Sequence, residues 1–83
     1  MRTGIEYMRD QFSHMSALIT EYLADPNEIN MLIAAQHISY IEGIAFAALM
    51  AHKENENDSD IAVAMSQESV VLRDAYYEKL RAK

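Results

Sequence analysis

Cysteine and tryptophan are absent from these 83 residues, and the chain has only one proline and two glycines. Without cysteine there is no disulfide, no thiol nucleophile and no zinc–thiolate centre. A chain of this length buries only about 60% of the surface that its unfolded form exposes, so its core is small. Because disulfides are excluded, association with another chain is the remaining way to stabilise so small a core.

Basic residues are scarce as well. The chain has 7 Lys and Arg against 13 Asp and Glu, which gives a formal net charge of −6, and no Lys or Arg lies between Arg9 and Lys53. This charge repels phosphate backbones, so we expect no direct binding of nucleic acid. The opening residues MRTGIEYMRDQF contain no apolar segment of the kind found in secretory signals, and we expect a cytoplasmic protein.

The remaining composition is that of a helical protein. Hydrophobic residues make up 51% of the chain, and the β-branched runs and glycine-rich turns that mark sheets are missing. We predict one all-α domain over residues 1–83, with helices at about 4–24, 26–52 and 60–81 and an acidic loop at 53–59. The short first connection predicts an antiparallel helical hairpin, on which the third helix packs to complete a three-helix bundle. We expect this bundle to form a homodimer.

The first predicted helix has its apolar residues at alternating steps of three and four, which is the spacing of a helix with one apolar side. These residues are Ile5, Met8, Phe12, Met15, Ile19 and Tyr22. The helix should end before Pro26, because a proline disfavours the helical conformation at the preceding Asp25. Asp25 is then the predicted N-cap of the second helix, with Pro26 in its first position.

The second predicted helix contains the longest apolar stretch, residues 29–51. Its length would suffice to span a membrane. Polar residues occupy its middle, however, and no cluster of Lys or Arg flanks it, so we expect no membrane contact. The polar residues are Gln36, His37, Ser39 and Glu42.

At 100° per residue, this second helix has two apolar faces. One consists of Met31, Ala34, Ile38, Ile41, Ala45, Ala48 and Leu49. The other consists of Ile29, Ile33, Tyr40, Ile44, Ala47 and Ala51. The first helix covers only one face, so the second face requires the third helix, a second copy of the chain or a foreign protein. We predict that the second face, together with Tyr77, is a protein interface.

The third predicted helix has a less regular apolar pattern. Its apolar side comprises Ile61, Met65, Leu72, Tyr76 and Leu80, with Ala62, Val71 and Ala75 beside it. Ser69 interrupts this side, which predicts a helix less firmly packed than the first. The polar connection before it is long enough for the helix to pack in its own chain or to exchange onto a neighbouring copy.

No set of residues has the spacing of a known catalytic, cofactor or metal site. Asp10 and His14 share a helix face because they are four residues apart, but the ligand patterns of zinc proteases and di-iron bundles are missing. The acidic run from Glu54 is not a calcium loop, since it lacks the central glycine and has Met65 where a glutamate ligand is required. We therefore expect no enzyme, no cofactor and no bound metal.

The resulting functional prediction is a small acidic, non-enzymatic protein-binding module that regulates, inhibits or scaffolds a partner protein through helical surfaces. One alternative is an acidic inhibitor of the mobile-element type that mimics nucleic acid and occupies the groove of a nucleic-acid-binding enzyme. A second alternative is a helical-bundle enzyme that binds a metal ion through Asp10 and His14 of paired chains.

Overall fold

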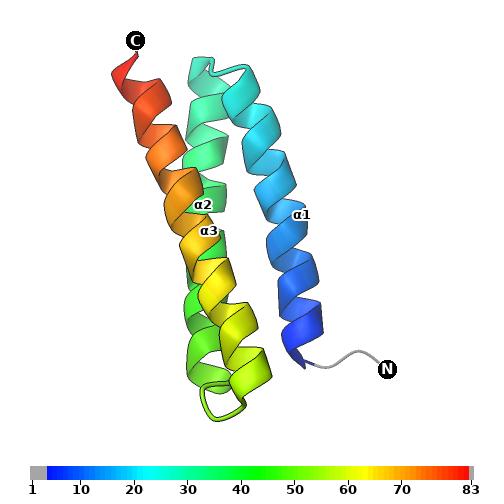
Figure 1. Ribbon diagram of the computed structural model, residues 1–83. Coiled ribbons are helices and arrows are strands. Elements are labelled where there is room, and N and C mark those ends of the chain that lie inside the picture. Colours follow the sequence, from blue (N-terminus) through cyan, green and yellow to red (C-terminus); the bar gives the residue numbers. More distant parts are fainter. Residues whose placement is uncertain (1–3, 83) are drawn as a thin grey trace.

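The computed structural model describes residues 4–82 and contains three α-helices: α1 (Gly4–Ala24), α2 (Glu28–Ala51) and α3 (Glu56–Arg81). No strand occurs among these residues. Figure 1 shows the three axes nearly aligned, with α1 and α2 joined at one end of the bundle and α2 and α3 joined at the other. All three pairs of helices contact one another. The predicted all-α three-helix bundle is confirmed.

The core follows from the apolar spacing of α1 and α2. The largest fully buried side chains are Phe12, Ile5, Ile19 and Ile41. Three of them lie seven residues apart on α1, so they share one side of the helix. On α2, the buried residues are Met31, Ala34, Ile38, Ile41, Ala45 and Ala48. This set is the first apolar face predicted for the second helix except Leu49, which is half-buried. Its three alanines let the neighbouring helices approach closely.

The start of α2 differs from the prediction. Its N-cap is Asn27, whose side-chain oxygen accepts a hydrogen bond from the Asn30 N–H at 2.9 Å. The Asn30 side chain in turn donates to the Asp25 carbonyl oxygen at 2.8 Å. Asp25 is therefore not the cap, and Pro26 lies in the connection rather than in the first helical turn. Asn and Asp cap about equally well, so the sequence left the choice between these two positions undetermined.

The start of α3 also differs, because much of the predicted acidic loop is helical. Asn55 is the N-cap and accepts from the Asp58 N–H at 3.0 Å. Glu56 and Asp58 then lie in the first turn, where carboxylates are stabilised by the positive end of the helix dipole. His52 Nδ1, 3.4 Å from Asp58 Oδ2, links the two sides of the short connection.

The apolar side of α3 is placed differently from the predicted one. Ala62, Met65 and Ser69 are buried, whereas Val71 and Leu80, predicted as part of the packed side, are 64% and 47% exposed. Ser69 does not interrupt the packing, because its small side chain fits inside the bundle and its hydroxyl donates to the Ser66 carbonyl oxygen at 2.8 Å. A local hydrogen bond thus satisfies a polar group where the pattern suggested a gap.

Candidate functional site

The second helix presents an exposed face that the other residues of the described range 4–82 leave uncovered. Ile29, Gln36, Gly43 and Met50 recur every seven residues along it, so they lie on one side of the helix. The exposed residues on this side, which we call the α2 face, are Ile29, Leu32, Gln36, Ser39, Tyr40, Gly43, Phe46, Ala47, Met50 and Ala51. Both α1 and α3 pack against the opposite, buried side of α2.

The α2 face is strongly apolar for an exposed surface. Ile29 is 70% exposed, Phe46 65% and Leu32 63%. Between Ile29 and Met50, over about 32 Å at 1.5 Å per residue, no charged residue belongs to the face, and the exposed Glu28 borders its N-terminal end. The one charged residue between these ends is Glu42, which lies at the edge and pairs with Arg73 of α3 at 3.4 Å.

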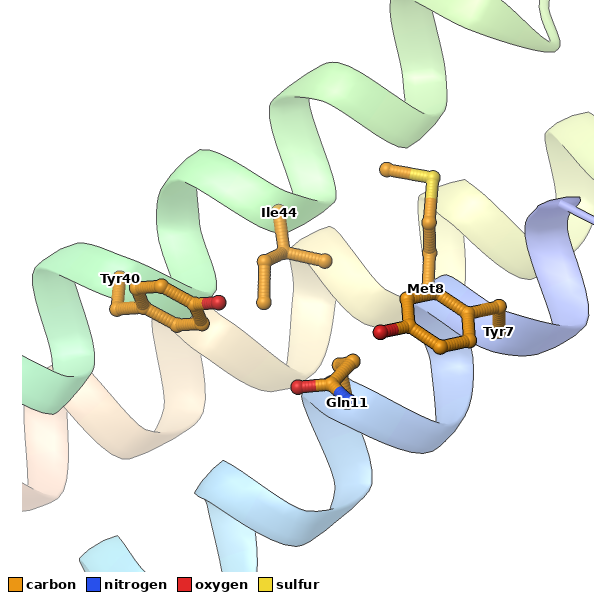
Figure 2. Close-up of a pocket in the computed structure, with 5 residues that line it drawn as sticks. All are labelled: Tyr7, Met8, Gln11, Tyr40 and Ile44. Atoms are coloured by element: carbon orange, nitrogen blue, oxygen red, sulfur yellow. The ribbon is translucent and has the colours of Figure 1, made fainter.

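On one side, α1 continues this surface. A hollow between α1 and α2 is lined by Tyr7, Met8, Gln11, Tyr40 and Ile44. Figure 2 shows the rings of Tyr7 and Tyr40 on opposite sides of the hollow, with Ile44 and Gln11 between them. Tyr7 is 58% exposed, so an aromatic ring borders the α2 face. Aromatic rings are enriched at protein interfaces.

On the side away from α1, residues of α3 extend the α2 face. Ser39 and Glu42 of α2 line a hollow together with Tyr77 and Leu80 of α3. Tyr77 therefore lies on the side of α3 that borders the α2 face. Val63 and Val70 precede it at intervals of seven residues, so they lie on that same side, and both are exposed.

The combined apolar surface is large for a chain of this size. Its nine large members expose between 41% and 70% of their surface, and they are Ile29, Leu32, Tyr40, Phe46, Met50, Val63, Val70, Tyr77 and Leu80. Large apolar residues have roughly 150–200 Å² each, so these nine expose on the order of 800 Å². The largest apolar patch on a typical monomer is about 300–600 Å², so this summed area over α2 and α3 is large for so small a chain. Exposed apolar surfaces of this size are typical of interaction sites.

The structure places the predicted interface residues in two groups. Ile29, Tyr40, Ala47, Ala51 and Tyr77 are exposed on or beside the α2 face. Ile33 and Ile44 are half-buried, and Ile44 lines the hollow against α1. The exposed face is therefore rotated away from α1 relative to the predicted one.

Sequence reasoning placed three large members of the α2 face, Leu32, Phe46 and Met50, on neither of its two apolar faces. Leu32 and Phe46 are fourteen residues apart, and Met50 follows Phe46 by four. This helical spacing was the signal that would have found them.

By length and composition α2 could also cross a membrane, and it is the one such helix among the residues described. In its most apolar segment, 28% of the residues are buried inside the bundle. The polar residues at its middle have separate environments. Glu42 pairs with Arg73, and the His37 ring meets the Tyr22 ring edge-on with centroids 5.6 Å apart.

The residues of the two alternative functions lie elsewhere. Asp10 and His14 are exposed on α1, and no group of three or more potential metal ligands occurs within residues 4–82. Exposed carboxylates are present on α3 at Glu56, Asp60, Glu68, Asp74 and Glu78, but Lys79 and Arg81 occupy its last turn. Neither a protein-family model nor a curated protein nor a solved structure matches the chain.

Proposed function

We propose that this protein is a non-enzymatic protein-binding module, and that the α2 face with its α1 and α3 borders is the surface that docks another polypeptide. The observation that carries the proposal is an exposed helix face about 32 Å long without a charged residue. Regulation, inhibition or scaffolding of a bound protein would act through this docking.

The energetics favour a covered state of this face. Full burial of a large apolar side chain is favourable by about 1.5–3 kcal/mol. Ile29, Leu32 and Phe46 each have about two thirds of their surface exposed, so covering each one contributes roughly 1–2 kcal/mol. Three such residues would serve as the main anchors of an interface.

A polypeptide suits this surface better than a lipid layer or a nucleic acid. Helices that lie on membranes carry Lys and Arg along their polar flank, whereas this chain has none between Arg9 and Lys53. A net charge of −6 also repels phosphate groups, whether of lipid or of nucleic acid. A protein surface imposes no such electrostatic requirement.

Site-specific photo-crosslinking in the native host tests the proposal. Replacement of Phe46 by the photoreactive analogue p-benzoylphenylalanine keeps an aromatic group in the α2 face. The matched control has the same group at Glu21, which is exposed on α1. We expect a discrete crosslinked polypeptide from position 46 and none from position 21.

The second substitution Leu32→Glu, which places a charge in the same face, should remove the product from position 46. Equal crosslinking at the two positions, or a product that Leu32→Glu leaves unchanged, would refute the proposed docking surface. The mass of the product also reports which polypeptide is bound.

A further inference from the structure

We infer that the polypeptide on the α2 face is a second copy of this chain, with the two α2 helices packed antiparallel about a two-fold axis level with Ser39 and Tyr40. The inference rests on the proposed function, because it names the occupant of the same surface. Four independent features of the described residues support it: Gly43, the order of large and small residues, the charges at the two ends and the available area.

Gly43 has no explanation within the single chain. It lies inside α2, where glycine is less favourable than alanine by about 1 kcal/mol. Its backbone has no positive φ, and a Cβ atom built on it would meet nothing within 4 Å. Neither backbone conformation nor internal packing requires a glycine here. A close approach by a helix from outside the chain would require one.

The α2 face complements itself when one copy is inverted. With a two-fold axis between positions 39 and 40, position n of one copy lies opposite position 79 − n of the other. Gln36 of one copy then lies opposite Gly43 of the other, and Leu32 lies opposite Ala47. Each small residue thus receives a large one, as interdigitated helix packing requires. Such a contact is isologous, so both copies use the same residues.

Charges at the ends of the face favour the same orientation. Glu28 precedes the face at its N-terminal end, Lys53 follows it at its C-terminal end, and both are exposed. Antiparallel packing brings Glu28 of each copy near Lys53 of the other, while Asp25 lies level with Glu54, so each end has one attractive pair and one repulsive pair. Parallel packing would bring like charges together at both ends, which is unfavourable.

The area is sufficient for a stable pair. A standard specific interface takes roughly 800 Å² from each partner, about a seventh of the 5519 Å² surface of this chain. The nine exposed apolar residues provide an area of that order. Tyr77 shares a hollow with Ser39 and is therefore level with the axis, where the tyrosines of the two copies approach each other.

Single cysteines test this geometry without background, since the chain has none of its own. We would prepare Ile29→Cys and Met50→Cys, and treat each variant alone and an equimolar mixture with a short bismaleimide. In an antiparallel pair, equivalent cysteines are about 32 Å apart, whereas Cys at 29 of one copy adjoins Cys at 50 of the other. We expect a crosslinked dimer from the mixture and none from either variant alone.

Two results would overturn the inference. Self-crosslinking of each variant alone would show a parallel pair, and monomers at all concentrations in sedimentation equilibrium would show that no second copy binds. In the second case a foreign product from photo-crosslinking at position 46 would leave the proposed function intact. The absence of any such product would refute both.

Sedimentation of the Gly43→Leu variant gives an independent readout. Because the site is open in the single chain, the added side chain should not disturb the fold, and far-UV circular dichroism checks this. At the close approach it overpacks the interface, so the dissociation constant should rise roughly tenfold or more. An unchanged dissociation constant in a folded variant would refute the close approach at Gly43.

Discussion

The two phenylalanines of the chain have opposite environments and provide a matched test of the fold. Phe12 is 1% exposed in the centre of the bundle, whereas Phe46 is 65% exposed on the α2 face. The same substitution, Phe to Ala, should therefore have different consequences at the two positions. At Phe12 it should destabilise the fold. At Phe46 it should leave the fold nearly unchanged and weaken association.

For Phe12→Ala the loss comes from both buried surface and a new cavity. Truncation of a buried phenylalanine costs about 3–5 kcal/mol. At roughly 0.05–0.15 kcal/mol per residue, the whole chain has a stability of about 4–12 kcal/mol. The substitution therefore removes a large fraction of the total, and the midpoint of thermal unfolding should fall by on the order of 20 °C.

For Phe46→Ala the loss within one chain is small. About one third of the residue is buried, and alanine is a better helix former than phenylalanine by roughly half a kcal/mol. The free energy of unfolding should therefore change by less than about 1 kcal/mol. Each copy of a dimer loses roughly 1–2 kcal/mol of interface burial, so the dissociation constant should rise by about thirtyfold or more.

Urea unfolding followed by far-UV circular dichroism, at a protein concentration below the dissociation constant, measures the first effect. Sedimentation equilibrium at higher concentrations measures the second. The reasoning would be refuted if Phe46→Ala destabilised the dilute protein as much as Phe12→Ala. That result would mean that Phe46 is covered within the chain and that α2 has a different rotation about its axis.

Three further substitutions test local features of the bundle. Ser16→Ala should raise the free energy of unfolding by about 1 kcal/mol, because its buried hydroxyl has no hydrogen-bond partner within the described part of the chain; urea unfolding should show a smaller gain for Ser69→Ala, whose hydroxyl is bonded. Asn27→Ala should cost about 1 kcal/mol through loss of the N-cap, and an equal cost of Asp25→Ala would contradict this assignment. Ala48→Leu should lower the thermal midpoint, since overpacking a fully buried site costs roughly 1–3 kcal/mol.

The sequence was sufficient to predict the elements whose patterns are redundant. The buried side of α2 was predictable because an apolar residue stands at every third or fourth position from Met31 to Ala48. The end of α1 was predictable because its seven-residue spacing stops just before Pro26. In both cases several residues indicate the same helix face, so no single exception changes the result.

The helix starts and the exposed face were less predictable for separate physical reasons. Asp25 and Asn27 are both good N-caps, and only the backbone conformation decides between them. The acidic run before Asp60 suits a solvated loop as well as the first turn of a helix. The exposed face of α2 depends on where α1 and α3 lie around it, which is a tertiary property. The pattern of α2 alone therefore did not separate Ile33 and Ile44, which are half-buried, from the exposed residues.

The distribution of charge gives the proposed pairing of two copies a natural end point. A face-to-face contact with two-fold symmetry is closed, because both copies use the same surface. The carboxylates that give the net charge of −6 lie outside the α2 face, so a completed pair presents an acidic surface to further copies. Like charge between pairs then opposes growth, while the uncharged face imposes no such repulsion on the two copies within one pair. An acidic chain with one neutral helix face is thus suited to form dimers without forming larger assemblies.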